Sequence, residues 1–460
     1  MSQGKVYLVG AGPGDPGLIT VRGCEVLAAA DAVLYDHLIA PELLNLARPE
    51  AERISVGKSA GHHTLPQDRI NALLVDKAGA GLCVVRLKGG DCFLFGRGGE
   101  EALACRRAGI PCEVVPGVTS ALAAPCYAGI PVTHRDYTSD VAVVTGHRKE
   151  AGPLQIPKAG TVIFLMSVGN LEAIVAALLD QGWPPETPMA AVERGTCYDQ
   201  RVITGQIANF SARAADAGLQ PPAVVVVGRV VDLHPSLDWF GTKRRVLVLG
   251  HHPHRYSHLG HIVHRRMIDC RPMEDQTQLD AVQRDLSVFD WIVFTSVNGA
   301  RIFFDRLGAG GRDARVLGSV KIAAIGQTTA RSLRSFGLCA DLIPSDESSK
   351  GLLAEFAKLD LKGKHILLPR ARVCSEELTQ GLADQGAAIE KVVVYQTVDL
   401  DPGEIDFGHI DAVLFTSGST VRAFARRFKT VPPGIQAWCL GLPTLAEARH
   451  HGIHADLMPH

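Results

Sequence analysis

Several features that mark specialised classes of protein are missing from these 460 residues. No apolar run approaches the roughly 18 residues that a membrane-spanning helix needs. The N-terminus runs directly into the strand-like stretch Val6–Val9, without the apolar core of a signal peptide. The formal net charge is −1, so no overall field would attract nucleic acid or an anionic membrane. We therefore expect a cytoplasmic protein with no nucleic acid and no membrane as its partner.

Cys-x-x-Cys pairs are also missing, although the chain has 11 cysteines. In a cytoplasmic setting, scattered cysteines of this kind predict neither disulfides nor a structural zinc site. The 46% of hydrophobic and 21% of charged residues are typical of a globular chain. The length corresponds to about three domains.

The first half of the chain alternates short β-branched runs with longer helical patterns. The runs are Val6–Val9, Ala32–Tyr35, Val84–Leu87, Val141–Thr145, Val162–Leu165 and Ala223–Val227. Such alternation predicts an α/β fold with mostly parallel sheets. The stretch Pro235–Arg245 breaks the rhythm and is typical of a linker, and a new strand is expected at Val246–Leu249.

The second half of the chain contains an internal repeat. Asp290–Ser296 recurs as Asp411–Ser417, and Gly326–Thr329 recurs as Gly441–Thr444. Both copies have the pattern strand, Thr-Ser loop, helix, strand, glycine loop, helix and strand. We therefore expect two similar α/β lobes, and a cleft between similar lobes is a natural ligand site.

Two glycine-rich loops that contain an aspartate follow predicted strands. Gly10–Asp15 precedes a helical segment and Asp36 ends the next strand, which imitates a dinucleotide-binding fingerprint. However, Asp15 replaces a third glycine, and its carboxylate would repel phosphates. With the second loop, Lys88–Arg97, the pair favours a small cationic ligand. The alternative is that both are tight turns whose aspartates cap the next helices.

These loops belong to an ordered set of seven motifs. The motifs are Val9–Thr20, Leu34–Asp36, Val56–Lys58, Leu87–Asp91, Val115–Ser120, Gly129–Tyr137 and Val144–His147. The set resembles the tetrapyrrole methylase family, and within it the uroporphyrinogen-III C-methyltransferases, over nearly all of residues 4–240. Cys92 departs from the family pattern, which usually has proline there, so the stiffness of that loop is in question.

The resemblance implies S-adenosylmethionine as the methyl donor. The residues that would line its site are Pro13, Gly89, Gly90, Asp91, Leu94, Thr119, Ser120, Met166, Gly195 and Ala223. Asp36 matches the family's proposed proton acceptor and Lys58 its proposed proton donor. The alternatives are a helix cap for Asp36 and a solvated side chain for Lys58.

The implied reaction is the methylation of uroporphyrinogen III at C2 and C7, which gives precorrin-2. Reduced pyrroles are electron-rich, so their carbons attack a sulfonium methyl in line, and positioning carries most of the rate. Asp36 would stabilise the resulting positive charge or accept the proton that leaves. Candidate partners for the substrate's carboxylates are Arg97, His134, Arg135 and Lys58.

A second ordered set of motifs lies in the repeat region. The motifs are Phe294–Gly299, Ala324–Ala330, Leu367–Ala371, Val394–Thr397 and Phe415–Ser417. They resemble uroporphyrinogen-III synthase over about residues 245–460. That family closes hydroxymethylbilane to uroporphyrinogen III with inversion of ring D and without a cofactor. Two departures are His251-His252-Pro253, where the family often has Thr-Arg-Pro, and Leu445, where alanine usually follows the glycine loop.

Hydroxyl groups of the second half are expected where strands end and helices begin, and helix N-termini bind anions. Ser296, Thr329, Ser417 and Thr444 are therefore candidates to hold the acetate and propionate arms of a linear tetrapyrrole. The alternative is that they are only N-caps. Tyr395 matches the tyrosine proposed to help the substrate hydroxyl leave, and the alternative is a half-buried hinge tyrosine.

Six histidines crowd the segment 251–264. His254, His258 and His261 would share one face of a helix, a spacing that metal ligands use. No carboxylate or cysteine completes a site locally, so we predict no metal. A basic helix that faces the substrate and a solvated face both stay open.

Together these patterns predict a fusion of two enzymes in an α/β chain. The methylase half would span 1–240, with subdomains of about 1–117 and 118–235. The synthase half would span 245–460, with lobe 1 at about 245–273 plus 401–460 and lobe 2 at about 276–398. Met267–Glu274 and Val392–Asp399 would form a two-strand hinge. The resemblance also implies a homodimer through the methylase half, and a place in sirohaem and cobalamin synthesis.

Three other hypotheses stay open. One is another corrinoid-pathway methylase with a C-terminal ligand-binding module, which substrate profiling would separate. Another is a regulatory second half, although Tyr395 and both Thr-Ser loops favour catalysis. The third is a nicotinamide oxidoreductase, which binding of NAD instead of S-adenosylmethionine would support.

Overall fold

The computed structural model describes residues 4–57, 65–147 and 154–459. They form two compact units, unit 1 (Met1–Lys243) and unit 2 (Arg244–His460), each with two five-stranded sheets. In the described part of the chain, no helix is both long and apolar enough to cross a membrane.

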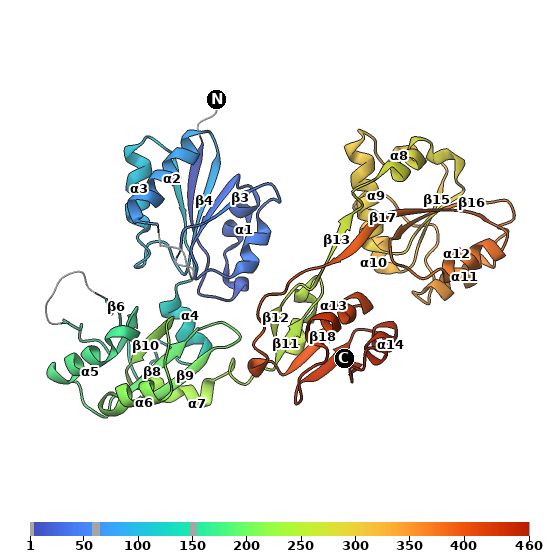
Figure 1. The fold of residues 1–460 in the computed structure, drawn as a ribbon. Helices are drawn as coiled ribbons and strands as arrows, with labels where there is room; N and C mark the ends of the chain where they lie inside the picture. The colour runs from blue at the N-terminus through green and yellow to red at the C-terminus, as the bar shows by residue number, and fades with distance from the viewer. Residues whose placement is uncertain (1–3, 58–64, 148–153, 460) are drawn as a thin grey trace. The chain divides into compact units, whose positions relative to one another are not determined.

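The first sheet of unit 1 is parallel throughout, in the order β3-β2-β4-β1-β5. Its strands are β1 (Lys5–Gly10), β2 (Ala32–Tyr35), β3 (Glu52–Ser55), β4 (Cys83–Lys88) and β5 (Cys112–Val115). Apolar side chains of β1, β2 and β4 are buried on both faces, as parallel strands between helices require. One face is covered by α1 (Val21–Ala28) and the 3-10 helix η2 (Pro41–Leu46), and the other by α2 (Gln67–Gly79) and α3 (Gly98–Arg107) (Figure 1).

The second sheet of unit 1 has the order β6-β7-β10-β8-β9. Only β6 and β7 are parallel, whereas β10 is antiparallel to β7 and β8, and β8 is antiparallel to β9. The expectation of mostly parallel sheets is therefore wrong here. The reason is that a continuous buried run such as Ala223–Val227 indicates a core strand but does not encode its direction.

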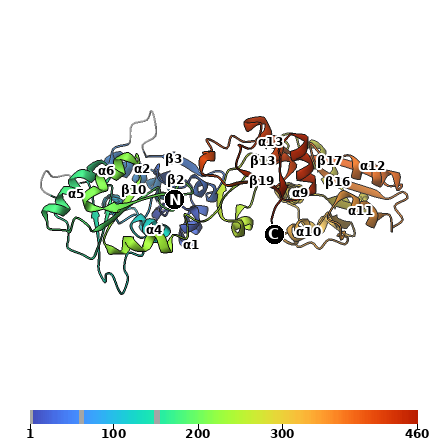
Figure 2. The same ribbon diagram turned by 90° about the horizontal axis from the view of Figure 1, so that it is seen from below.

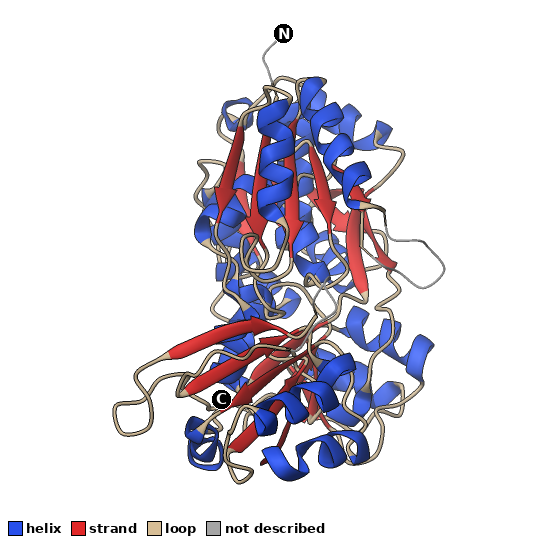
Figure 3. Ribbon diagram, turned by 90° about the vertical axis from the view of Figure 1, so that its left-hand side faces the viewer, coloured by secondary structure: helices blue, strands red, loops and turns tan. Residues whose placement is uncertain are grey.

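Helices cover both faces of this sheet, as Figure 3 shows for unit 1. On one face lie α4 (Ser120–Tyr127) and the 3-10 helix η5 (Arg229–Leu233), and on the other α5 (Leu171–Asp180) and α6 (Phe210–Asp216). The strands are β6 (Val141–Thr145), β7 (Thr161–Leu165), β8 (Pro188–Glu193), β9 (Arg201–Gln206) and β10 (Ala223–Val227).

The predicted linker begins within the short helix α7 (His234–Leu237) and packs in part against α4. The rings of Trp239 and Phe240 each lie 4.9 Å from the ring of Tyr127, between centroids. Trp239 Nε1 also donates a hydrogen bond to the Cys126 carbonyl at 3.0 Å. The end of unit 1 is therefore part of its fold.

Unit 2 consists of two lobes, each a sheet surrounded by helices (Figure 2). Lobe 1 has the parallel order β12-β11-β18-β19-β20. Its elements are β11 (Arg245–Val248), β12 (His261–His264), β18 (Ala412–Phe415), α13 (Gly418–Phe428), β19 (Gln436–Cys439), α14 (Leu442–His450) and β20 (Asp456–Leu457).

Lobe 2 has the order β13-β17-β16-β14-β15. Its strands are β13 (Ile268–Pro272), β14 (Trp291–Phe294), β15 (Lys321–Ala324), β16 (His365–Ala371) and β17 (Ala388–Asp399). Its helices are α8 (Thr277–Arg284), α9 (Val297–Ala309), α10 (Gln327–Arg334), α11 (Ser349–Phe356) and α12 (Glu377–Asp384).

The predicted repeat of two α/β lobes is confirmed down to single hydrogen bonds. The run β14, α9, β15, α10 in lobe 2 corresponds to β18, α13, β19, α14 in lobe 1. Asp290 exchanges two bonds with His365: its carboxylate accepts the His365 N–H at 2.9 Å and its own N–H donates to the His365 carbonyl at 2.8 Å. Asp411 forms the same pair of bonds with Arg245, at 2.6 and 2.9 Å.

The strands β13 and β17 run between the two lobes (Figure 1). β17 pairs in parallel with β16 and, in its last residues, antiparallel with β13. The sequence analysis places all of β13 within lobe 1 and within the predicted hinge segment Met267–Glu274, but the strand pairs in the sheet of lobe 2. At the end of β17, Asp399 forms a bidentate pair with Arg426 of α13 at 2.6 and 2.7 Å.

The expected helical face of three histidines is wrong. The 3-10 helix η6 (Pro253–Leu259) ends before Gly260, which has φ +145°, and His261 begins strand β12. The β-branched residues Ile262 and Val263 instead pair with β11. His258 and His261 therefore lie on different elements.

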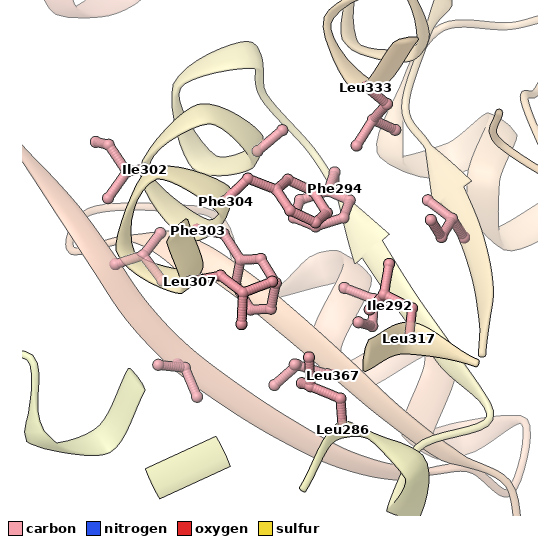
Figure 4. Close-up of a cluster of buried hydrophobic side chains, with 14 of the residues drawn as sticks. Leu286, Ile292, Phe294, Ile302, Phe303, Phe304, Leu307, Leu317, Leu333 and Leu367 are labelled. Carbon is pink, nitrogen blue, oxygen red and sulfur yellow. The ribbon is translucent and has the colours of Figure 1, made fainter. Parts of the chain in front are cut away.

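A core of large apolar side chains holds α8, α9 and α10 against the sheet of lobe 2 (Figure 4). Phe303 of α9 is fully buried, and its ring lies 5.5 Å from that of Phe294 and 5.2 Å from that of Phe304. The α9 face that packs on the sheet is thus almost entirely aromatic and aliphatic.

Replacing Phe303 by Ala should lower the free energy of unfolding of unit 2 by about 3–5 kcal/mol, because it removes buried apolar area and leaves a cavity. Hydrogen exchange followed by mass spectrometry would measure this in peptides from unit 2, with peptides from unit 1 as the internal control. The matched variant Val373→Ala removes a side chain of a residue that is 81% exposed and should have little effect. Equal losses from both variants would contradict this assignment of the core.

Candidate functional site

The predicted site residues of the first sheet lie at its carboxyl edge. Because all five strands are parallel, the loops that follow them meet at this edge, where open α/β sheets bind ligands. The residues are Pro13 after β1, Asp36 after β2, Gly89, Gly90 and Asp91 after β4, and Thr119 and Ser120 after β5. Lys58, expected after β3, lies outside the described residues.

Glycines allow these loops to approach one another closely. A Cβ on Gly117 would lie 2.3 Å from the Gly90 carbonyl oxygen and 2.6 Å from the Gly10 Cα. Gly90 itself has φ +64°, in the left-handed region that favours glycine. Gly12 and Gly90 exchange N–H···O bonds of 3.2 and 2.7 Å. Backbone groups rather than side chains therefore form this part of the edge.

The Asp91 carboxylate organises the second glycine loop. One oxygen accepts the N–H groups of Phe93 and Leu94 at 2.8 and 3.2 Å, and the other accepts the Gly117 N–H at 3.0 Å. These bonds fix the loop after β4 to the loop after β5. Three N–H donors satisfy most of the carboxylate, so the structure uses Asp91 to hold two loops together.

The start of α4 lies beside the same loop. Thr119 is the N-cap, and its hydroxyl oxygen accepts the Ala121 N–H at 3.2 Å. A Cβ on Gly90 would lie 3.8 Å from the Ser120 nitrogen. Leu94 packs against the apolar cluster that contains α4 residues. The structure thus brings Gly90, Leu94, Thr119 and Ser120 together.

The remaining predicted cofactor residues lie at one edge of the second sheet. Met166 follows β7, Gly195 follows β8, and Ala223 begins β10 opposite Glu193. β10 is antiparallel to both neighbours, so its first residue lies at the edge where they end. The Ala223 side chain packs in the cluster on the face away from α4, so only its backbone is available there.

Strained backbone surrounds Gly195. Arg194 and Thr196 have φ values of +48° and +72°, and such residues cluster at functional sites. Cys197 lies beside the first glycine loop, since a Cβ on Gly14 would lie 2.5 Å from its Sγ. Burial raises the pKa of the Cys197 thiol to about 11, so the sulfur is neutral at pH 7.

Asp15 joins the edges of the two sheets. Its N–H donates to Thr196 Oγ1 at 3.0 Å, and its carboxylate accepts the Tyr127 hydroxyl at 2.9 Å and the Gly17 N–H at 2.7 Å. Gln200 completes the circuit by accepting the Thr196 N–H at 2.8 Å and donating to the Tyr127 carbonyl at 3.2 Å. Asp15 caps the 3-10 helix η1 (Pro16–Leu18), which agrees with the turn interpretation of this loop.

Asp36 is partly exposed and pairs with a buried arginine. Arg86 Nη2 donates to Asp36 Oδ1 at 2.5 Å, and the two side chains are 3% and 30% exposed, respectively. The next helix, η2, has Ala40 as its N-cap, so the helix-cap alternative for Asp36 does not hold. The exposed side chain of Leu38 lies next to Gly89.

The other predicted substrate residues of unit 1 lie in exposed loops. Arg97 forms a bidentate pair with Glu100 at 2.8 and 2.7 Å on the surface. His134 packs edge-on against the Tyr137 ring at 5.0 Å between centroids, and Arg135 is exposed. Among the described residues, the structure records no contact between any of these three side chains and Asp36.

In unit 2, the hydroxyl groups of the buried Tyr395 and the partly buried Ser296 form a pair. Their oxygens lie 3.0 Å apart, and Tyr395 is 9% exposed. Ser296 Oγ also accepts the Gly299 N–H at 2.9 Å and so caps α9. Burial raises the pKa of Tyr395, and the Ser296 hydrogen bond and the Arg370 charge oppose this shift. The phenol is therefore neutral at pH 7 and able to donate.

The other three predicted side chains of unit 2 differ in their environments. Ser417 is the N-cap of α13, as the N-cap alternative states. Thr329 and Thr444 lie in the first turns of α10 and α14, and both residues are buried. At α10, the Gln327 N–H donates to a carboxylate of the protein itself, Glu347, at 3.1 Å.

Two buried arginines were missed by the sequence analysis. Arg86 interrupts the apolar run of β4, and Arg370 lies at the β-bulge in β16 and is 5% exposed. Arg370 Nη2 donates to the Ser375 carbonyl at 3.0 Å, while Nη1 lacks a hydrogen-bond partner among the described residues. An arginine inside an apolar strand was an available signal, because buried arginines are nearly always paired.

No group of three or more His, Cys, Asp or Glu side chains that could hold a metal ion occurs in the described ranges.

Comparisons with known proteins divide the chain in the same way. Residues 5–211 match the family described as Tetrapyrrole (Corrin/Porphyrin) Methylases, and residues 257–460 match Uroporphyrinogen-III synthase HemD. Siroheme synthase 1 of Halorhodospira halophila (strain DSM 244 / SL1) is 51% identical over 243 residues, which are 52% of this chain and 50% of that protein. The chain therefore spans about half the length of that relative.

A solved structure of uroporphyrin-III C-methyltransferase from Thermus thermophilus, complexed with S-adenyl homocysteine, is 40% identical. It covers 50% of this chain and 100% of its own, with a TM-score of 0.43.

One relative matches the whole arrangement. Porphyrin biosynthesis protein HemD of Ruminiclostridium josui is 36% identical over 486 residues, covering 98% of this chain and 95% of that protein. The chain therefore belongs to the family of porphyrin biosynthesis enzymes in which a tetrapyrrole methylase precedes a uroporphyrinogen-III synthase.

Proposed function

We propose that unit 1 methylates uroporphyrinogen III at C2 and C7 with S-adenosylmethionine, giving precorrin-2. We also propose that unit 2 makes that substrate by closing hydroxymethylbilane with inversion of ring D. The observation that carries the first proposal is the position of Asp36. Its partly exposed carboxylate lies at the carboxyl edge shared with the glycine loops, and Asp15 joins that edge to the edge of the second sheet.

The residues at these edges fit S-adenosylmethionine. Backbone groups of Gly89 and Gly90 are accessible to a polar ligand because neither residue carries a side chain, and N–H groups at the start of α4 suit a carboxylate. Asp91 would shape this site through its three N–H bonds rather than bind the ligand itself. The exposed side chains of Leu38 and Met166 offer apolar contact. When bound, S-adenosylmethionine supplies a methyl group on a positively charged sulfur.

Asp36 would act on the charge that the reaction places on the substrate. A ring carbon forms the new bond to the methyl group, and the carbon–sulfur bond breaks with its electron pair on sulfur. The macrocycle then carries one positive charge until it loses a proton. The Asp36 carboxylate would stabilise this charge or accept the proton. Lys58 as proton donor, the carboxylate contacts of Arg97, His134 and Arg135, and a homodimer through unit 1 stay predictions.

In unit 2, Tyr395 would help the hydroxyl group of hydroxymethylbilane to leave. Its neutral phenol donates a hydrogen bond to that oxygen, the carbon–oxygen bond breaks with its pair on oxygen, and ring closure later releases a proton from carbon. Ser296 orients the phenol at 3.0 Å. Ser296, Ser417, Thr329 and Thr444 as contacts of the substrate's arms stay predictions, and the burial of the two threonines favours backbone N–H groups for this task.

The whole chain should convert hydroxymethylbilane and S-adenosylmethionine into a dimethylated type III product. Liquid chromatography with mass spectrometry would follow the two mass increments, and uroporphyrinogen III supplied directly would test the methylase alone. An unmethylated type III product would disprove the methylase assignment. If the chain methylated only a later corrinoid substrate, unit 1 would instead be assigned to a later methylation step of the corrinoid pathway.

Asp36→Asn should slow methylation by about 100-fold or more, because the amide keeps the size of the side chain but neither balances charge nor accepts the proton. Ring closure by unit 2 should be unchanged in the same sample. The control Asp76→Asn removes an exposed carboxylate from α2 and should leave both rates as they were. Loss of both activities in Asp36→Asn would contradict the division of labour.

Tyr395→Phe should slow ring closure by at least about tenfold, because it removes a positioned hydrogen-bond donor. Methylation of supplied uroporphyrinogen III should continue at the normal rate. The raised pKa of Tyr395 keeps the phenol protonated beyond its ordinary value of 10.0. Ring closure should therefore not decline below pH 10 through ionisation of this group, and a pH–rate profile that fell near pH 8 only when Tyr395 is present would exclude the assignment.

A further inference from the structure

Three buried charged side chains lie beneath Asp36 and form a buried charge cluster with it. The cluster consists of Asp36, Arg86, Lys88 and Glu101, and the last three side chains are 3%, 5% and 0% exposed. Arg86 spans the cluster, with Nη2 on Asp36 Oδ1 at 2.5 Å and Nε on Glu101 Oε1 at 3.0 Å. Lys88 Nζ donates to the same Glu101 oxygen at 3.1 Å. Only Asp36 reaches the surface.

The cluster is electrically balanced, with two cations and two carboxylates. Burying charges is costly, and removing one partner of a buried set leaves an uncompensated charge. Glu101 is central because it faces both cations, and the Gln67 amide also donates to it at 3.2 Å. Its second oxygen, Oε2, has no hydrogen-bond partner in the described part of the chain. Glu101 therefore supplies a full negative charge to the cluster although only one of its two oxygens accepts hydrogen bonds.

The cluster also fixes the geometry of the edge. Arg86 Nη1 donates to the carbonyls of Leu34 on β2 and Leu87 on β4, at 3.4 and 3.2 Å. Lys88 is the last residue of β4 and directly precedes Gly89. Arg86, which holds Asp36, thus also links β2 to the strand that carries the second glycine loop.

We infer that Arg86, Lys88 and Glu101 are positioning residues for methylation: Arg86 holds the Asp36 carboxylate at the edge, and Glu101 balances the two buried cations so that the negative charge of Asp36 remains available to a cationic macrocycle. Without Glu101, two cations would face one carboxylate, and the field at the edge would favour anions. This inference rests on the proposed role of Asp36.

A charge-balanced pair of substitutions tests the inference. Glu101→Gln keeps the shape of the side chain but leaves the cluster with one excess positive charge. It should reduce kcat for methylation about tenfold or more while KM changes little. Combining it with Lys88→Met restores neutrality, so the double variant Lys88→Met/Glu101→Gln should recover most of the lost rate. If these residues had a purely structural role, the second substitution in the core would lower the methylation rate further instead of restoring it.

Two readouts in the same chain control for misfolding. Ring closure by unit 2 and the affinity for S-adenosylhomocysteine, measured by calorimetry, should stay within about twofold of the unchanged chain in all variants that fold. Arg86→Lys is a second probe in case Glu101→Gln fails to fold. It keeps the charge but loses the fork that reaches Asp36 and Glu101 together, so methylation should fall at unchanged affinity for S-adenosylhomocysteine.

The outcomes separate this inference from the proposed function. Full methylation by Glu101→Gln or by Arg86→Lys overturns the positioning role, and so does a double variant no faster than Glu101→Gln. If Asp36→Asn retains methylation, the proposed role of Asp36 fails first. If Asp36→Asn loses methylation while Glu101→Gln does not, only the inference about the buried charge cluster fails.

Discussion

The two sheets of unit 1 are joined by hydrogen bonds of one residue, Asp15, through both its backbone N–H and its carboxylate. Its carboxylate accepts the Tyr127 hydroxyl of α4, and its N–H donates to Thr196 in the loop after β8. Burial and the Asp15 charge raise the pKa of Tyr127, so the phenol stays a donor. A carboxylate in a glycine-rich loop therefore joins two sheets, and it places the glycine edge of one beside the strained Arg194–Thr196 segment of the other.

The site at this edge is built from backbone, and the aspartates have different tasks. The Asp91 carboxylate accepts three N–H hydrogen bonds that shape the loop. Asp36, in contrast, is partly exposed and forms an ion pair with the buried Arg86. Close packing of Gly10, Gly90 and Gly117 removes side chains where loops converge. The two aspartates therefore differ in their surroundings: Asp91 is enclosed in the second glycine loop, whereas Asp36, which follows β2, keeps part of its carboxylate exposed at the same edge.

Unit 2 is built from two copies of one α/β arrangement. The equivalent bonds of Asp290 and Asp411 to the first residues of β16 and β11 show that the two lobes share one construction. The equivalent helices α9 and α13 are both capped by a serine, Ser296 and Ser417, but the surroundings recorded at the helix N-termini of lobe 2 include further side chains. In lobe 2, α9 is capped by Ser296 next to Tyr395, while α10 receives the Glu347 carboxylate. A repeat in sequence thus predicts a repeated scaffold but not a repeated chemistry.

The sequence by itself determined the strands, the repeat and the edges at which the site residues lie, because β-branched runs and glycine loops act through local conformation. Only the tertiary structure decided which side chains form ion pairs with one another and which strands pair. Nothing near Arg86 in the sequence shows that it spans Asp36 and Glu101, since these contacts cross 50 and 15 residues. The direction of β10 and the position of His261 on a strand were likewise set by neighbouring strands. Hydrogen bonding and charge pairing act over distance in space, and only the folded chain fixes which groups are near.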